Sequence, residues 1–159
     1  MNVNVGDFLA RRAAVTPDRE AYVDPQMGLR LSFSQLNERV NQLANALSSA
    51  GVNPGDRVGL CLMNSVEFLE SFLAVAKIGG VVVPLNWRLV ADELEFIIKD
   101  SGAETMIYGS EFHSVVSDLH SRGDKTDVVR WIEAGDAASV MPFAQHYDAV
   151  RDSASVSEP

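Results

Sequence analysis

Two apolar runs, Val58-Gly59-Leu60-Cys61-Leu62-Met63 and Val81-Val82-Val83, decide the fold, because the segment between them has the pattern of a helix. The first run has no polar interruption, which is typical of a parallel strand covered on both faces. Asn64 and Glu67 stand at helix-capping spacing behind it. Apolar residues then recur on one helical face, at Phe68, Phe72, Val75 and Ala76. Gly79-Gly80 ends that helix, so the stretch predicts a strand, a helix and a second strand.

The first thirty residues predict a helix and a hairpin. Apolar positions between Val5 and Val15 have helical spacing, and Pro17 ends the run because proline cannot continue a helix. Glu20–Asp24 and Leu29–Phe33 flank a turn-forming segment that contains Gly28. Two short runs around such a turn are the pattern of a β-hairpin.

A longer helix is expected between the hairpin and the first buried strand. Ser32 and Gln35 stand at the spacing of a capping box. The apolar residues that follow fall on one face: Leu36, Val40, Leu43, Ala44 and Leu47. Gly51 then provides a left-handed C-terminal cap.

The same alternation continues toward the C-terminus. The pattern predicts a helix over Asp92–Asp100, a strand over Thr105–Tyr108, a helix over Glu111–His120 and a strand over Val128–Ile132. Four strands joined by helices pair in parallel through right-handed crossovers. The predicted fold class is therefore α/β, with a doubly wound, mainly parallel sheet flanked by helices. We expect residues 1–148 to form one domain, and residues 149–159, which are polar and small, to form a linker-like tail.

The composition of the 159 residues excludes several classes of protein. A net charge of −9, with scattered Lys and Arg, argues against nucleic-acid binding. Cys61, the only cysteine, lies in an apolar run and is expected to be a buried thiol in a reducing cytoplasm. The N-terminus lacks the charged region of a secretory signal. The most hydrophobic stretch, Phe72 to Leu85, is interrupted and shorter than the ~20 residues of a spanning helix, so we expect any membrane contact to be peripheral.

Three blocks stand in the order and spacing of a known superfamily: Leu31-Ser32-Phe33-Ser34-Gln35-Leu36, Gly55-Asp56-Arg57-Val58 and the segment Ala76 to Asn86. Together they resemble the AMP-forming acyl-CoA synthetase, luciferase and peptide-synthetase adenylation enzymes, over roughly residues 5 to 150. The segment Pro84 to Leu89 is most similar to fatty-acyl-CoA ligases, because amino-acid adenylation domains usually have an aspartate where Asn86 stands. The chain is identified by this resemblance as the N-terminal segment of such a ligase.

The resemblance implies a two-step reaction. A carboxylic acid, here a fatty acid, reacts with ATP to give an acyl-adenylate and pyrophosphate, and coenzyme A then displaces AMP. ATP, Mg²⁺ and coenzyme A are thus the implied cofactors of the parent enzyme, and the acid and the rest of the polypeptide are its implied partners.

The family's phosphate loop, its adenine and ribose motifs and its C-terminal domain with the catalytic lysine are missing from this sequence. Phosphates are usually held by a glycine-rich turn with a lysine. None of Lys77, Lys99 and Lys125 follows such a turn. We therefore assign no catalytic, cofactor-binding or metal-binding residue, and expect the segment alone to bind no cofactor and to be inactive.

The loops after the predicted strands are the candidate ligand sites, because ligands of open α/β sheets bind at the carboxyl ends of the strands. These loops are Met63-Asn64-Ser65, the segment Leu85 to Arg88, and Tyr108-Gly109-Ser110. Asn86 and Arg88 are expected beside the substrate or at a domain interface; the alternative is that they only fix their own loop. Tyr108-Gly109-Ser110 is interpreted as a strand-to-helix junction and not as an anion site.

Other polar groups have structural interpretations. Asn64 is interpreted as a helix cap, and Lys77 as a side chain that extends its charge to water near a helix end. The acidic residues at the next helix start complement the helix dipole, and the histidines lack the third ligand of a metal site. We expect all of these side chains to be solvated: Asp92, Glu93, Glu95, His113, His120 and His146.

Two alternatives come from other functional classes. The chain could be a non-enzymatic module that binds a partner or forms a homo-oligomer through exposed apolar surface. The second alternative is a flavodoxin-like nucleotide binder, which is supported only by the alternation of strands and helices.

Overall fold

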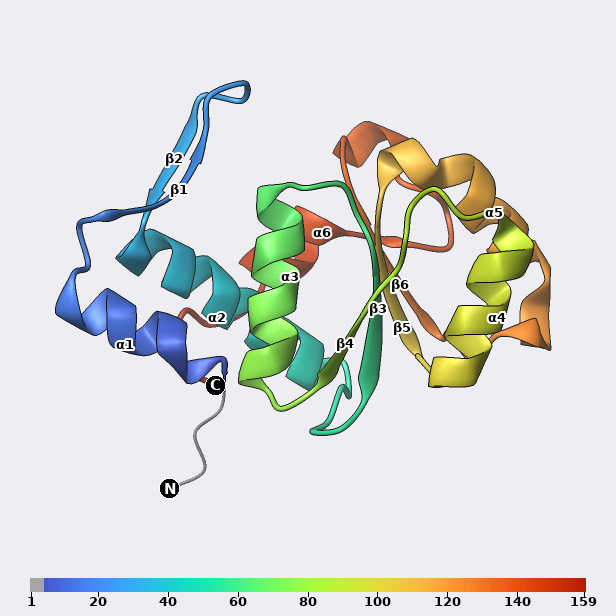
Figure 1. Cartoon of the computed structure of the whole chain (residues 1–159), viewed down its shortest axis with the longest axis horizontal. Helices are drawn as coiled ribbons and strands as arrows, with labels where there is room; N and C mark the ends of the chain where they lie inside the picture. The colour runs from blue at the N-terminus through green and yellow to red at the C-terminus, as the bar shows by residue number, and fades with distance from the viewer. Residues whose placement is uncertain (1–4) are drawn as a thin grey trace.

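The computed structural model describes residues 5–159 and contains two sheets. A hairpin of β1 (Glu20–Asp24) and β2 (Leu29–Ser32) forms the small antiparallel sheet. The second sheet has five parallel strands in the order β4-β3-β5-β6-β7 (Figure 1). Its strands are β3 (Arg57–Cys61), β4 (Val81–Pro84), β5 (Thr105–Gly109), β6 (Arg130–Ala134) and β7 (Gln145–His146).

Helices precede, connect and follow these strands. They are α1 (Asp7–Val15), α2 (Phe33–Ser49), α3 (Val66–Lys77), α4 (Ala91–Ser101), α5 (His113–Ser121) and α6 (Tyr147–Asp152). Three short 3-10 turns complete the set: η1 (Ser110–Phe112), η2 (Gly123–Lys125) and η3 (Ala137–Ser139). Within residues 5–159, no helix is long and apolar enough to cross a membrane.

The predicted capping box forms and fixes the start of α2. The Ser32 hydroxyl accepts a hydrogen bond from the Gln35 backbone N–H at 3.3 Å, and the Gln35 side chain accepts one from Ser32 N at 2.9 Å. Because Ser32 is the N-cap of α2, Phe33 already belongs to the helix. The strand β2 therefore ends at Ser32, one residue before the predicted end at Phe33. Gly51, with φ of 93°, follows the helix end as predicted.

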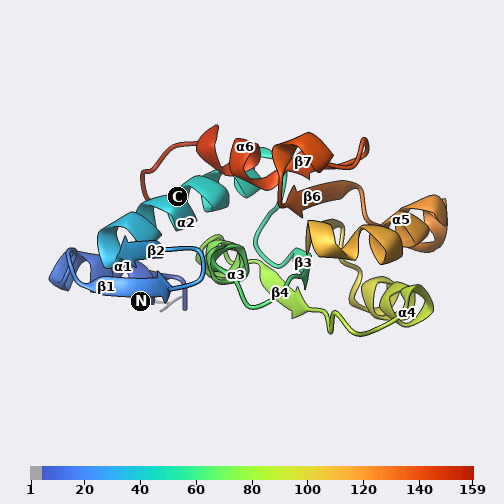
Figure 2. The same ribbon diagram turned by 90° about the horizontal axis from the view of Figure 1, so that it is seen from above.

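Alternate residues of the parallel strands divide between two cores. Ile107 and Ile132 pack on the side of α2 and α3, whereas Met106, Tyr108 and Trp131 pack on the side of α4 and α5. Figure 2 shows α2, α3 and α6 on one face of the sheet and α4 and α5 on the other. Both faces are covered, which explains the continuous apolar runs and confirms the predicted doubly wound α/β fold.

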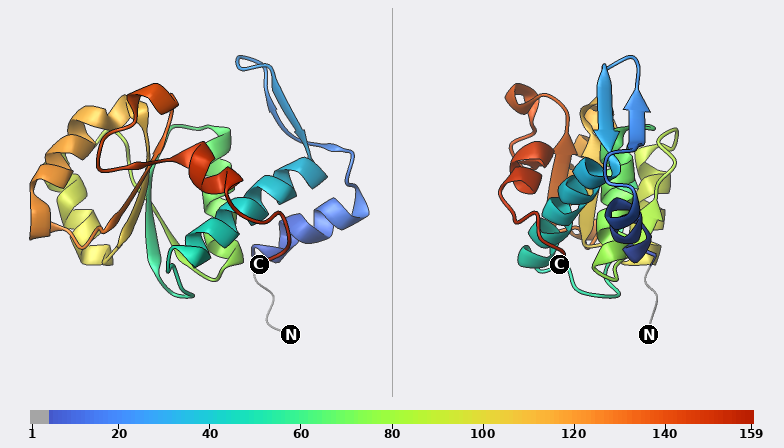
Figure 3. Two further views of the ribbon diagram at one scale, coloured as in Figure 1. Left: turned by 180° about the vertical axis from the view of Figure 1, so that it is seen from behind. Right: turned by 90° about the vertical axis from the view of Figure 1, so that its left-hand side faces the viewer.

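The N-terminal elements extend away from the sheet. α1 packs against α2, and Gly6, just before α1, lies against the backbone of Lys77 at the end of α3. The β1–β2 hairpin follows α1 and projects beyond the start of α2 (Figure 3).

The C-terminal third differs from the prediction. The sheet has a fifth strand, β7, whose two residues are too few to show an alternating pattern. α6 follows it and buries Tyr147 and Arg151. The predicted boundary between residues 148 and 149 lies inside α6, so the tail that we expected to be linker-like begins as a helix; the division into 1–148 and 149–159 stays a prediction. The helix expected over 111–120 begins as η1 and continues as α5.

Candidate functional site

The winding of the sheet changes direction between β3 and β5, because β4 lies on one side of β3 and β5 on the other. Ligands of open α/β sheets bind in the crevice outside the carboxyl ends of the strands at such a point. The structure has a cavity of about 190 Å³ there, which we call the switch crevice. It is lined by Leu62, Met63, Ser65, Glu67, Gly109, Ser110, Glu111, Ala134 and Gly135.

Two glycines leave room for close contacts in the switch crevice, Gly109 within the loop after β5 and Gly135 between that loop and the loop after β6. A Cβ atom on Gly109 would lie 2.3 Å from Glu111 Oε2, and one on Gly135 would lie 2.4 Å from Ser110 Oγ. Gly135 also has φ of 149°, a conformation that residues with a side chain rarely adopt. The loops after β5 and β6 are therefore in close contact.

The loop after β3 is fixed by Ser65. Its backbone is extended, and its hydroxyl accepts a hydrogen bond from Phe68 N at 3.3 Å, which caps α3. The prediction that Asn64 caps this helix is wrong, because the helix begins one residue later. Asn64 is exposed beside the crevice.

The charge in the switch crevice is negative. Glu67 and Glu111 lie in its lining, and the nine lining residues include no Lys or Arg. Next to the crevice, burial raises the pKa of the Cys61 thiol to about 11, and the charge of Glu111 adds to this effect. Cys61 is therefore a buried neutral thiol, as predicted, and is not an activated nucleophile.

A polar cluster beside the ends of β5 and β6 was missed in the sequence. The Glu133 carboxylate, with no exposed surface, accepts hydrogen bonds from the Tyr108 hydroxyl at 2.7 Å and from Met141 N at 3.0 Å. Its other oxygen lies 2.6 Å from His113 Nε2. Burial opposes ionisation of Glu133, but the bonds from Met141, His113 and Tyr108 outweigh it and lower the pKa.

This cluster positions elements and does not line the crevice. Glu133 joins β6 to β5, to α5 and to the loop before β7 through the three bonds. Burial, followed by the bond to Glu133, raises the pKa of Tyr108, so its hydroxyl stays protonated and donates. The signal in the sequence was a single carboxylate that directly follows the apolar pair Trp131-Ile132 in β6, because a buried Glu is rare without partners.

The structure also corrects the predictions for three sets of side chains that we expected to be solvated. His113 contacts Glu133 and is not simply solvated, whereas His120 is exposed but stacks on Phe143 with ring centroids 3.8 Å apart. Lys77 does not extend its charge to water: its side chain is only 3% exposed. The carboxylates near the start of α4 also have partners, since Glu93 accepts from Val90 N, and Asp92 and Glu95 pair with Arg122.

Asn86 and Arg88 lie in the loop after β4, outside the lining of the switch crevice. The Asn86 side-chain oxygen accepts a hydrogen bond from Arg88 N at 3.1 Å. The guanidinium of Arg88 lies 4.5 Å from the centre of the Trp87 ring, and Trp87 contacts Phe112 after β5. These contacts fix the loop; the position of Asn86 and Arg88 beside a substrate stays a prediction.

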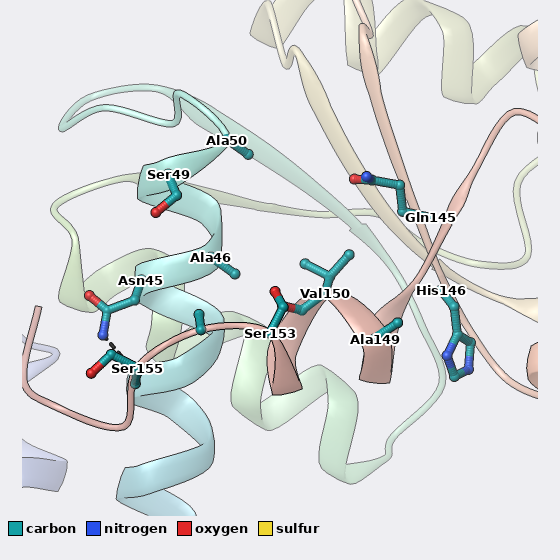
Figure 4. Close-up of a pocket in the computed structure, with 11 residues that line it drawn as sticks. Asn45, Ala46, Ser49, Ala50, Gln145, His146, Ala149, Val150, Ser153 and Ser155 are labelled. Carbon is teal, nitrogen blue, oxygen red and sulfur yellow. Dashed lines mark hydrogen bonds between the residues drawn. The ribbon is translucent and has the colours of Figure 1, made fainter.

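A larger hollow of about 610 Å³ lies between α2, α6 and β7 (Figure 4). Its wall is made mostly of small residues from the two helices, such as Ala46, Ser49, Ala149 and Ser153. Asn45 and His146 lie at its edges and bind backbone carbonyl groups of Ser155 and Gly135. Since Asn45 and His146 are used in holding the chain and the hollow lies away from the switch point, we place the candidate site at the switch crevice.

Comparison with known proteins decides the family. The sequence model of the AMP-binding enzymes matches residues 9–158, which is nearly the whole chain. The chain belongs to the AMP-binding enzyme family. The resemblance seen in the three sequence blocks is thereby confirmed.

Individual members of the AMP-binding family are similar over most of this chain. Long-chain-fatty-acid–CoA ligase FadD13 of Mycobacterium tuberculosis is 40% identical over 142 residues, which are 89% of this chain and 28% of the relative. A feruloyl-CoA synthase of Amycolatopsis is 39% identical over 118 residues, 74% of this chain and 24% of the relative. The crystal structure of the N-terminal domain of FACL13 from Mycobacterium tuberculosis covers 99% of this chain with a TM-score of 0.89 and 37% identity; the match covers 38% of that structure.

The AMP-binding family implies ATP, and the residues of the switch crevice do not fit its phosphates. Phosphates are held by backbone N–H groups together with Lys or Arg, whereas this crevice presents Glu67 and Glu111. Among residues 5–159 there is also no cluster of three His, Cys, Asp or Glu side chains that could hold a metal ion. The chain spans little more than a quarter of the FadD13 relative, so we derive no reaction step from it.

Proposed function

We propose that this chain is the N-terminal part of an acyl-CoA ligase that activates a fatty acid with ATP and transfers the acyl group to coenzyme A. The identity of 40% with FadD13 over 89% of the chain carries this proposal. The match to the FACL13 N-terminal domain, at a TM-score of 0.89, supports the same class.

In this proposal the segment supplies scaffold and part of a substrate wall. Asn86 and Arg88 are the proposed substrate-adjacent residues, because their loop lies at the carboxyl edge of the sheet. ATP, Mg²⁺ and coenzyme A are proposed for the parent enzyme, held by the remainder of its polypeptide. The isolated 159 residues are proposed to be inactive, since the switch crevice is acidic.

The test is acid-dependent release of pyrophosphate by the protein encoded by the full parent reading frame. Palmitate, ferulate and no acid would be compared, because relatives of this chain include both a long-chain-fatty-acid ligase and a feruloyl-CoA synthase. We expect the highest kcat/KM with palmitate. No release with any carboxylic acid would overturn the ligase proposal, and a preference for ferulate would overturn the fatty-acid assignment.

The isolated chain would be assayed in parallel. We expect no pyrophosphate release and no change of melting temperature with ATP, FMN or NAD. An unchanged melting temperature with all three would also exclude a flavodoxin-like nucleotide binder. Turnover that co-purifies with the 159-residue chain through two further columns would contradict its proposed inactivity.

An alternative, a non-enzymatic self-association or partner-binding module, is favoured by one observation. Phe96 and Val90 on and before α4 are 70% and 61% exposed, and Phe96 shares a shallow hollow with Leu89 and Ile97. Light scattering tests it: a dimer that becomes monomeric in Phe96→Asp supports the alternative, and a monomeric unchanged chain counts against it. A cytoplasmic location, with any lipid contact at the surface, is part of the main proposal and is tested by cell fractionation.

A further inference from the structure

Lys77, at the end of α3, has a buried ammonium group with three described partners. The side chain is 3% exposed. Its Nζ donates to the side-chain oxygen of Asn37 at 2.9 Å, to that of Asn41, and to Glu158 Oε2 at 2.7 Å. A buried ammonium is strongly unfavourable unless it is paired and hydrogen-bonded. Glu158, which is 54% exposed, provides a countercharge from among the residues that the structure describes.

The same face of α2 carries a row of amides. Asn37, Asn41 and Asn45 are four residues apart and therefore lie one above another on the helix. Asn37 and Asn41 use their oxygens on Lys77 and their NH₂ groups on Glu158, at 2.8 and 3.3 Å. Amides suit this position because one side chain both accepts from the ammonium and donates to the carboxylate.

The rest of the row binds the backbone of residues 154–158, which we call the strap. Asn41 donates to Val156 O at 2.8 Å, and Asn45 donates to Ser155 O and Ser157 O at 2.9 and 2.8 Å. Figure 4 shows Asn45 directly beside Ser155 at the edge of the hollow, with the hydrogen bond between them dashed. Every one of these contacts uses a strap carbonyl group, so the amide row does not bind the side chains of Ser155, Val156 and Ser157. The Ser155 hydroxyl instead accepts a hydrogen bond from Ser157 N within the strap, at 3.1 Å.

We propose that Lys77 and the α2 amide row form a recognition site for an extended peptide segment with one carboxylate side chain, and that the strap is its occupant. Carbonyl groups fix the path of the segment, and the Lys77–Glu158 pair fixes its register. The strap is therefore held by a single side chain of its own, Glu158, which makes the contact releasable without unfolding of the sheet. This inference does not depend on the ligase activity.

The experiment uses the whole 159-residue chain and backbone ¹⁵N relaxation. In the unchanged protein, we expect order parameters in the strap near those of α2, about 0.85. Glu158→Gln keeps the shape but removes the charge, so we expect strap values below about 0.6 while α2 stays rigid. Asp124→Asn is the matched control, because it makes the same kind of change at an exposed carboxylate with no described partner, and we expect it to leave the strap rigid.

Two further variants separate recognition from general stability. Lys77→Met should release the strap as Glu158→Gln does, and the Val156→Ala and Ser157→Ala double variant should leave it rigid. A mobile strap in the unchanged chain, a rigid strap in Glu158→Gln, or release by the double variant would each overturn the proposal. If Lys77→Met does not fold, Glu158→Gln and the double variant still decide the question.

Discussion

Tyr147 donates a hydrogen bond from its hydroxyl to the Glu70 carboxylate at 3.0 Å, and this bond joins α6 to α3. Both residues are buried, with 1% and 0% of their surface exposed. Arg39 of α2 donates to the other Glu70 oxygen, and Arg151 Nη1 lies 3.6 Å from Glu70 Oε2. Glu70 therefore holds three helices together on one face of the sheet.

Replacement of Tyr147 by Phe should lower the free energy of unfolding by about 2 kcal/mol, the usual contribution of a hydrogen bond to a charged group. Burial, followed by the charge of Glu70, raises the pKa of Tyr147, so the hydroxyl stays a donor over the whole accessible pH range. Urea denaturation would measure the change as a lower midpoint with an unchanged m-value.

Tyr22→Phe is the matched control for this prediction. Tyr22 is half-buried, and no hydrogen bond of its hydroxyl is described within residues 5–159. Removal of the Tyr22 hydroxyl should change the free energy of unfolding by less than about 0.5 kcal/mol. Equal effects of the two variants would show that the Tyr147–Glu70 bond does not stabilise the fold.

Glu133→Gln should make the stability of the chain less dependent on acid pH. The folded-state pKa of Glu133 is lowered below its unfolded value of about 4.3, so its contribution is present above that value and is lost as the pH falls through the folded pKa. At pH 7 we expect the variant to be less stable by about 2 kcal/mol or more, because Gln cannot replace a carboxylate that accepts three hydrogen bonds.

The measurement is urea denaturation of both proteins between pH 7 and pH 3. The difference in the free energy of unfolding between the unchanged chain and the variant should become smaller below about pH 4, because Glu133 becomes protonated in the unchanged chain. Since the comparison is a difference, the other acidic residues with lowered pKa values, such as Glu158, contribute equally to both proteins. A gap that stays constant with pH would contradict the assigned role of the Glu133 charge.

The elements that were predicted correctly are those in which local chemistry repeats. α2 has a capping box and five apolar residues in helical register, and four of the five residues of β3 belong to the apolar run Val58–Met63. A short local stretch of sequence was therefore enough to predict each element. β7 and α6 were missed because two and six residues do not establish a period.

The polar contacts could not be predicted for a different reason. The partners of Lys77 on α2 and in the strap are 36 to 81 residues away in sequence, and Glu133 meets Tyr108 across two strands. An isolated Lys near a helix end therefore looks the same whether it reaches water or a buried carboxylate. The position of the switch crevice could be predicted, since parallel strands bring their carboxyl ends to one edge, but its acidic character depends on the placement of Glu67 and Glu111.

Gly6→Ala and Gly109→Ala form a matched pair with different expectations. In both, the new Cβ atom would lie 2.3 Å from its nearest neighbour. At Gly6 the neighbour is the backbone Cα of Lys77, which cannot move without shifting α1 or α3, so we expect a loss of about 1–3 kcal/mol. At Gly109 the neighbour is the end of the flexible Glu111 side chain. Neither Gly6 nor Gly109 has a positive φ angle, so an alanine can adopt the backbone conformation at both positions.

We therefore expect Gly109→Ala to lose less stability than Gly6→Ala, because the exposed Glu111 side chain can turn away from the new methyl group. Thermal and urea unfolding of both variants would measure this. The reverse order of stability would show that α1 is not held against the end of α3.

Cys61 should react with thiol reagents only when the chain unfolds. Its pKa of about 11 leaves roughly one part in a thousand as thiolate at pH 8, and its side chain has no exposed surface. At pH 8 we expect labelling by a disulfide reagent to be slow in buffer and complete within the mixing time in concentrated urea. The thiol lies deep between β3 and the helices α4 and α5, so labelling requires unfolding of the chain. In Gly6→Ala the labelling rate in buffer should therefore rise only in proportion to the loss of global stability. Fast stoichiometric labelling of the folded chain would place an opening at the carboxyl end of β3 and would contradict the buried, neutral state of Cys61.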